Sequence, residues 1–157
     1  MSKIITTHLT VSAPVEDVWE ALVDLAGYRT WNPFITAAAG TIGVGERLEL
    51  TIQPPGGREV AFQPCVTAVE QNRYVEWLGR LALPGIFDGR HSFTLTTMPG
   101  GRTFLQQSES FTGVLIPFTG AMLARTRAGF VAMNEALAQR TTRRTPHRRE
   151  DSLGSPQ

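Results

Sequence analysis

Two polar residues, His91 and Glu109, have the types and the spacing that acid–base chemistry needs. Each lies in a segment of strand-like character, 86–97 and 102–111, and the odd-numbered positions form the more apolar face of both segments. We therefore expect both side chains on the core side of a sheet. A three-residue loop at 99–101 would place them directly opposite each other. A two-residue loop would put the two apolar faces on opposite sides of the sheet, which core burial disfavours.

Directly opposed side chains on antiparallel strands have Cβ atoms about 4.5 to 5.5 Å apart, close enough for a hydrogen bond. An imidazole positioned by a carboxylate can anchor a ligand carbonyl or take a proton from an activated carbon. His91 and Glu109 are therefore candidate catalytic residues and candidate ligand contacts. A purely structural pair stays open, because a partly buried His and Glu need partners in either case. Asp88, in the FDGR segment, is interpreted as a turn residue.

The remaining candidate ligand-binding residues are mostly aromatic. Aromatic side chains dominate protein cores, so each one alone is explained as well by packing as by a site. Their concentration near an alanine-rich helix favours a pocket. Arg125, on that helix, is interpreted either as a partner for an anionic ligand or a local acid, or as a solvated flank. With His91 and Glu109, the candidates are Trp31, Phe34, Trp77, Phe87, Phe93, Phe111, Leu115, Phe118, Met122, Arg125 and Phe130.

Composition indicates a single globular domain. The chain has 157 residues, 41% of them hydrophobic and 18% charged, which suits one sizeable core. We expect a domain over 1–141, without a signal peptide or membrane span, and a cytoplasmic protein. Cys65 is the single cysteine, so an internal disulfide is excluded, and three scattered histidines do not suggest a zinc site. We expect no metal and no cofactor.

The C-terminal segment 142–157 is polar and rich in arginine. It lacks apolar periodicity and is predicted to be disordered. Its arginines could contact nucleic acid or another acidic surface, but a solubilising tail without a partner explains them as well. The rest of the chain is not basic, so we expect no specific nucleic-acid partner.

The elements that must position these residues follow a simple order. An alternating segment at 3–11 predicts a strand, and 12–25 predicts an amphipathic helix with Ser12 as its N-cap. Six strand-like segments without helices between them follow, which implies antiparallel pairing and excludes a doubly wound parallel sheet. A long helix is predicted over 117–140. The six strand segments are 34–42, 46–53, 58–70, 73–81, 86–97 and 102–111.

Two further features bear on the site. The glycines of GTIGVGE, 40–46, resemble a dinucleotide fingerprint, but a strand-like segment follows instead of a helix, so they are interpreted as hairpin residues. The last helix is rich in alanine and glycine. Small residues permit either close packing of the helix on the sheet or an internal cavity, and both alternatives stay open.

The order of these segments resembles the SRPBCC group of the START-like, helix-grip superfamily. The resemblance covers about residues 3 to 140 and rests on VSAPVEDVWEALVDLAGYRTWNPF, VGERLEL, VTAVEQNRYVEW, GIFDGRHSFTL, GRTFLQQSESFTGVL and the last helix. The superfamily includes polyketide cyclase/dehydrase-type proteins and chaperone-ATPase-activator homology domains. The resemblance implies an α+β fold in which a curved antiparallel sheet of about seven strands wraps around the C-terminal helix. It also implies a pocket, since members bind lipids, plant hormones or polyketides.

Three hypotheses on function remain. The first is a non-catalytic carrier or sensor of a hydrophobic small molecule such as a lipid, polyketide or aromatic metabolite, because the sequence shows no recognisable nucleophile or nucleotide loop. The second is a cyclase, aromatase or lyase-type enzyme that uses His91 and Glu109. The third is a protein-interaction module, which predicts a filled interior and an exposed apolar patch. Both a monomer and a homodimer are compatible with the sequence.

Overall fold

Two antiparallel sheets and a long C-terminal helix form the protein, as seen in a computed structural model that describes residues 2–81 and 83–144. The larger sheet has the order β1-β8-β7-β6-β5 and the smaller sheet the order β2-β3-β4. The strands are β1 Ser2–Val11, β2 Ile35–Ala39, β3 Glu49–Ile52, β4 Val60–Phe62, β5 Cys65–Glu70, β6 Tyr74–Leu81, β7 Phe87–Met98 and β8 Arg102–Thr112. The helices are α1 Val15–Val23, α2 Gly120–Arg144 and two short 3-10 helices, η1 Leu25–Thr30 and η2 Ile116–Phe118. This architecture confirms the predicted α+β helix-grip fold.

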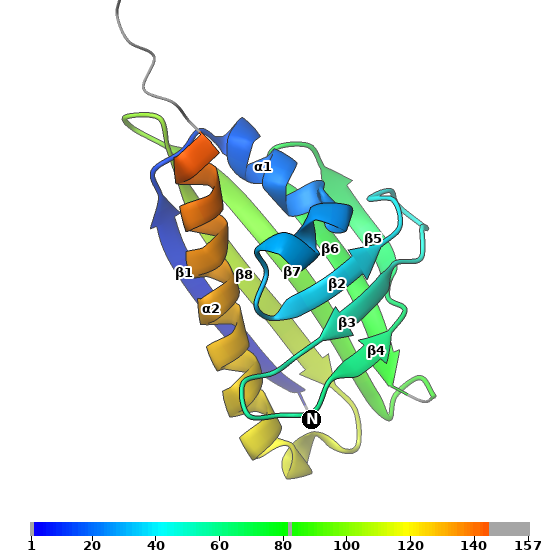
Figure 1. Cartoon of the computed structure of the whole chain (residues 1–157). Helices are drawn as coiled ribbons and strands as arrows, with labels where there is room; N and C mark the ends of the chain where they lie inside the picture. Colours follow the sequence, from blue (N-terminus) through cyan, green and yellow to red (C-terminus); the bar gives the residue numbers. More distant parts are fainter. Residues whose placement is uncertain (1, 82, 145–157) are drawn as a thin grey trace, which may run out of the picture.

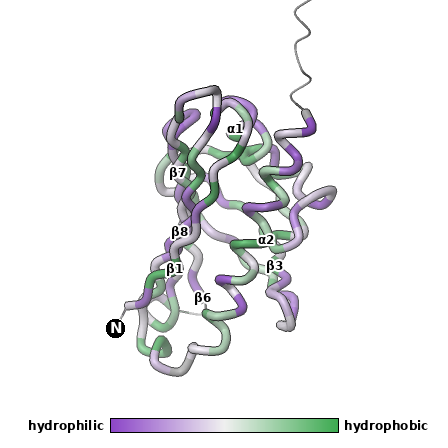
Figure 2. Tube along the Cα trace, turned by 90° about the vertical axis from the view of Figure 1, so that its left-hand side faces the viewer, coloured by the Kyte–Doolittle hydropathy of each residue, from purple (hydrophilic) through white to green (hydrophobic). Residues whose placement is uncertain are grey.

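The helices and the smaller sheet lie on one face of the larger sheet (Figure 1). Helix α2 packs along β1, while β2, β3 and β4 lie towards the side of the sheet formed by β5 and β6. Figure 2 views the same layers from the side, with β1, β7 and β8 on one side and α2 and β3 on the other. Core side chains fill the space between these layers, and Phe93 and Phe130 are fully buried there. Within the described ranges, no helix is both long and apolar enough to cross a membrane.

The β7–β8 hairpin has the predicted register. Met98 pairs with Arg102 across a three-residue loop, and His91 pairs with Glu109. Gly100 and Gly101 both have positive φ angles, of 80° and 67°, which glycine adopts without steric cost. The predicted register is therefore confirmed.

The predicted strand 58–70 is divided into two strands. Its first part is β4 in the smaller sheet, and its second part is β5 at the edge of the larger sheet. The break falls at Gln63 and Pro64, and the carbonyl of Pro64 accepts a hydrogen bond from the Leu48 amide. Proline has no N–H for a strand ladder, which explains why pairing stops there. The described chain therefore has eight strands, where about seven were expected.

The helix boundaries differ in detail from the sequence expectation. Helix α1 has Pro14 at its N-cap without a side-chain hydrogen bond, so the assignment of this role to Ser12 was wrong. Residues 116–118 form η2 before α2 begins at Gly120, and α2 continues through Arg144. The first three residues of the expected tail are therefore helical, and residues 145–157 lie outside the described part of the chain.

Gly129 allows α2 to approach Phe34 closely. A Cβ atom at position 129 would collide with the ring of Phe34, which is buried and meets the ring of Phe130 edge-on at a centroid distance of 5.5 Å. One turn and two turns earlier on the same helix, Thr126 and Met122 line a cavity instead. Both alternatives that the small residues left open therefore occur along α2.

Candidate functional site

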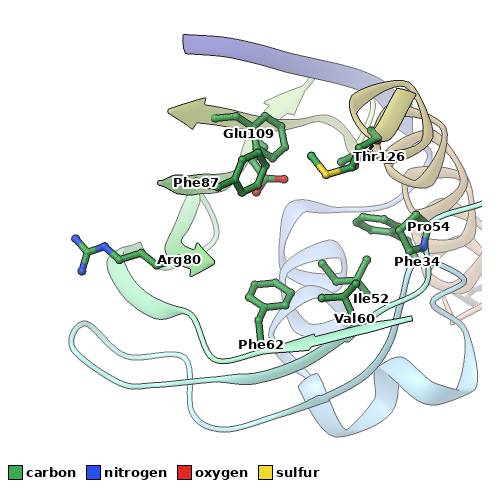
Figure 3. Close-up of a pocket in the computed structure, with 13 residues that line it drawn as sticks. Phe34, Ile52, Pro54, Val60, Phe62, Arg80, Phe87, Glu109 and Thr126 are labelled. Carbon is green, nitrogen blue, oxygen red and sulfur yellow. Dashed lines mark hydrogen bonds between the residues drawn. The ribbon is translucent and has the colours of Figure 1, made fainter. Parts of the chain in front are cut away.

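A half-enclosed cavity of about 180 Å³ lies between the larger sheet, the smaller sheet and the first turns of α2 (Figure 3). The larger sheet contributes side chains from β7 and β8, among them Phe87, Glu109 and Phe111. The smaller sheet contributes Ile52 of β3, and β4 contributes Phe62. Figure 3 shows Phe62, Ile52 and Val60 across the cavity from Phe87 and Glu109. The lining is therefore mostly apolar, with one carboxylate on the wall formed by the larger sheet.

Glu109 supplies the carboxylate of this wall. Its side chain is 16% exposed, and its Oε2 lies 3.3 Å from Nδ1 of His91. The other charged residue of the lining, Arg80, points away from the cavity and lies 3.9 Å from Asp88. The hydroxyl of Thr126 already donates to the Met122 carbonyl at 3.0 Å. A ligand in the cavity would consequently meet a hydrogen-bond acceptor at Glu109.

Two glycines on neighbouring strands make room for the groups that line this wall. Gly79 of β6 pairs with Gly89 of β7. A Cβ at Gly89 would collide with Oε1 of Glu109, and a Cβ at Gly79 would come within 3.0 Å of the Phe62 ring. The main chain of β6 and β7 is thus covered by side chains from β8 and β4. A glycine inside a strand often marks such a close approach.

His91 lies behind Glu109 and is not among the lining residues. Its residue surface is 4% exposed. The ring stacks on Trp77 at a centroid distance of 5.1 Å, and it contacts the rings of Phe93 at 4.8 Å and Phe130 at 4.9 Å. The structure thus brings the predicted pair together, but it gives the two residues different positions. Glu109 reaches the cavity, and His91 supports it from the aromatic core.

The other predicted site residues fall into four groups. Phe34, Phe87, Phe111 and Met122 line the cavity with Glu109. Trp77, Phe93 and Phe130 are buried in the core without lining it. Leu115 and Arg125 are exposed, and Trp31 is half-buried beside Tyr28. Phe118 belongs to η2, but its side chain lies outside the described part of the structure.

Sequence reasoning missed eight lining residues. They come from β3, β4, the adjoining loop, the glycine pair and α2, and one of them is the charged Arg80. The interior strand glycines were a signal that could have located part of this wall. No comparable signal exists for strands of three or four residues, where alternation is too short to read. The missed residues are Ile52, Pro54, Val60, Phe62, Gly79, Arg80, Gly89 and Thr126.

The outer face of the same sheet holds a polar cluster around Glu76, next to Trp77 on β6. The Glu76 carboxylate accepts hydrogen bonds from Tyr74 at 2.6 Å, Thr67 at 2.7 Å and Arg90 at 2.6 Å. Burial raises the pKa of Glu76, but the hydrogen bonds from Tyr74, Thr67 and Arg90 and the Arg90 charge together lower it below its ordinary value. Burial and the bond to Glu76 raise the pKa of Tyr74.

We expect Glu76 to contribute to the acid sensitivity of the fold. Its folded-state pKa is lowered, so its stabilisation is present above the ordinary glutamate pKa and is lost as the pH falls through the folded value. Lowering the pH from about 6 to about 3 should therefore reduce the free energy of unfolding more in wild type than in Glu76→Gln. Urea unfolding at each pH measures this free energy. Glu70→Gln is the control, because the Glu70–Arg73 pair is exposed. Equal pH slopes for wild type and Glu76→Gln would contradict this assignment.

Comparison with known proteins supports this architecture. The model of a family described as polyketide cyclase / dehydrase and lipid transport matches residues 3–143. The structure is similar to the Zhui aromatase/cyclase from Streptomyces sp. R1128, with a TM-score of 0.78 at 18% identity over 94% of this chain and 98% of that chain. It is also similar to a START superfamily protein from Mycobacterium smegmatis, with a TM-score of 0.72 at 19% identity over 90% and 99% of the two chains.

A third similar structure is norcoclaurine synthase from Thalictrum flavum in complex with dopamine and hydroxybenzaldehyde. Its TM-score is 0.71 at 15% identity, and the match covers 93% of this chain and 90% of that chain. At these identities the likeness shows a shared fold. No curated protein matches the sequence.

Proposed function

Because the chain belongs to the polyketide cyclase / dehydrase and lipid transport family, we propose that it binds a ring-containing hydrophobic small molecule in the cavity beneath α2. The observation that carries this proposal is the apolar lining with the carboxylate of Glu109 on its wall. Glu109 accepts a hydrogen bond from the ligand, and the aromatic side chains of Phe34, Phe62 and Phe87 contact its ring. Hydrophobic ligand sites commonly combine an apolar lining with a few polar groups in this way.

The size of the cavity agrees with a ligand that contains one or two rings. An apolar cavity of about 150 Å³ is able to take benzene, and this cavity measures about 180 Å³ and is open on one side. A larger ligand would extend through that side, past the partly exposed Val60 and Met122. The similar structures include an aromatase/cyclase and a synthase that holds dopamine and hydroxybenzaldehyde, which also favours aromatic ligands.

Glu109 requires the polar group of the ligand to be a hydrogen-bond donor. An ionised carboxylate only accepts hydrogen bonds. A phenol, an enol or an ammonium group satisfies it, whereas a ligand carboxylate would place two like charges close together. The proposed ligand class is therefore an aromatic or polyketide-like molecule with a donor group.

Filling the cavity should weaken binding. Isothermal titration calorimetry with 2-naphthol, a two-ring phenol, is expected to detect binding to wild type. Ile52→Trp should weaken it by about tenfold or more, because each 1.4 kcal/mol of lost contact is a factor of ten. Thr51→Trp is the matched control, since Thr51 neighbours Ile52 on β3 and is not among the cavity lining. Equal affinities for the two variants, or no binding to wild type by any phenol of a size series, would refute the proposal.

A second candidate function is a cyclisation that begins with proton abstraction. The hydrogen bond between His91 and Glu109 favours it, because a carboxylate held by an imidazole is positioned to act as a general base. In this reaction Glu109 takes a proton from the carbon between two carbonyls of a polyketide-like substrate, and the C–H electron pair passes into the enolate. His91 holds the carboxylate through its N–H and does not touch the substrate.

Hydrogen exchange would test this step. An aryl-1,3-diketone incubated in D₂O should exchange its acidic C–H faster with wild type than with Glu109→Gln, as followed by proton NMR. Lost exchange with retained binding would support general base catalysis, and equal exchange would leave the protein as a binder. The protein-interaction hypothesis required a filled interior, and the cavity favours a small-molecule ligand over it.

A further inference from the structure

We propose that Gln107 is a positioning residue that keeps His91 neutral, with its single ring proton on Nδ1. His91 then donates to Glu109, and the pair keeps one net negative charge. The negative charge makes the cavity select ligands that donate hydrogen bonds. This consequence rests on the proposed function. The protonation state itself is a property of the ligand-free protein and is testable without any ligand.

The contacts of the Gln107 amide nitrogen carry the proposal. Gln107 lies on β8, two residues before Glu109, and is fully buried. Its Nε2 is 3.1 Å from Nε2 of His91 and 3.7 Å from the sulfur of Met133. An amide nitrogen is a donor, so the ring nitrogen that it faces must be the unprotonated acceptor. The thioether sulfur is a second, weak acceptor, which agrees with this orientation of the amide.

The other ring nitrogen then carries the proton. Nδ1 of His91 is 3.3 Å from Oε2 of Glu109, which accepts from it. The remaining contacts of the ring are the aromatic faces and edges of Trp77, Phe93 and Phe130. Among the described residues these contacts come from β6, β7, β8 and α2, and Glu109 is the one charged group that faces the ring. The amide N–H of Gln107 therefore determines whether the His91 ring is neutral or an imidazolium.

The reversed amide defines the competing state. With the amide nitrogen assigned to the His91 side, Oε1 of Gln107 is buried without a hydrogen-bond partner. A reversed amide would place that oxygen against Nε2 of His91, accept from a protonated ring and make the His91–Glu109 pair neutral overall. A ligand carboxylate would then meet less repulsion at the wall. Gln107 thus sets the ligand class of the cavity without touching the ligand.

Nitrogen NMR of the histidine ring distinguishes the two states. Replacing His8 and His147 with glutamine leaves His91 as the single histidine. In long-range ¹H–¹⁵N spectra at about pH 7.5, we expect one protonated nitrogen, Nδ1, and one unprotonated nitrogen, Nε2. In Gln107→Glu the new carboxylate faces Nε2, and we expect the unprotonated signal to be lost as both nitrogens become protonated. Gln106→Glu is the matched control, because neighbouring strand residues point to opposite faces, and it should retain the wild-type signals.

Two results would overturn the proposal. The first is a protonated Nε2 in the otherwise wild-type chain, either as the other tautomer or as an imidazolium. The second is a Gln107→Glu spectrum identical to that of Gln106→Glu. The first measurement decides the question even where Gln107→Glu fails to fold. A neutral Nδ1–H ring together with no phenol binding would refute the proposed function and leave the role of Gln107 intact.

Discussion

Replacing Gly129 with valine is expected to lower the free energy of unfolding by about 3 kcal/mol, the upper part of the range for overpacking a core. The first added carbon would collide with the Phe34 ring. That ring is 2% exposed and meets the Phe130 ring edge-on, so relieving the collision would require it to shift into the cavity that it lines. Urea unfolding would measure the loss, and the melting temperature should fall by about 6 to 12 °C for a domain of this size.

Gly120→Val is the matched control for this change. Both glycines belong to α2, but a Cβ at Gly120 meets no atom within 4 Å. The control therefore carries the helix-propensity change from glycine to valine, a gain of a few tenths of a kcal/mol, without the collision. Equal stabilities of the two variants would mean that α2 does not approach Phe34 as closely as described.

Replacing Glu109 with leucine is expected to weaken the binding of 2-naphthol by about tenfold to a hundredfold. A hydrogen bond to a charged group contributes about 1.5 to 3 kcal/mol, and each 1.4 kcal/mol is a factor of ten in affinity. Naphthalene has no donor group, so its affinity should change little. The ratio of the two affinities, measured by calorimetry, isolates the contribution of the carboxylate.

The control for this prediction is Glu70→Leu, which removes an exposed glutamate at the end of β5. It should leave both affinities unchanged. Equal losses for 2-naphthol and naphthalene in Glu109→Leu would show that the substitution reshapes the cavity and that the ligand hydroxyl does not bind Glu109.

Local sequence signals made the fold predictable, together with the opposition of His91 and Glu109 in the site. The glycines at 100 and 101 specify a tight turn, and alternation over long strands then fixes the opposition of His91 and Glu109. The division of the 58–70 segment was also signalled, by Pro64, but a proline inside a segment does not say that the two halves join different sheets.

The lining of the cavity was less predictable for physical reasons. Alternation gives His91 and Glu109 the same face, but their different depths depend on Gly89, which leaves space for the carboxylate, and on the rings that enclose the imidazole. Trp77 and Phe87 are both aromatic residues in strands of one sheet, yet one is core and the other lines the cavity. Such depth depends on how α2 and the smaller sheet dock, which a periodic pattern does not encode.

Because of the paired glycines of β6 and β7, the side chains that would contact a ligand at this wall come from other strands than the main chain that they cover. Phe62 and Glu109 lie over main chain that has no side chains of its own at Gly79 and Gly89. Substitutions at positions 62 and 109 can therefore change the chemistry of the wall while the pairing of the strands beneath them persists. Related chains could diverge in specificity by this route at little cost to their folding.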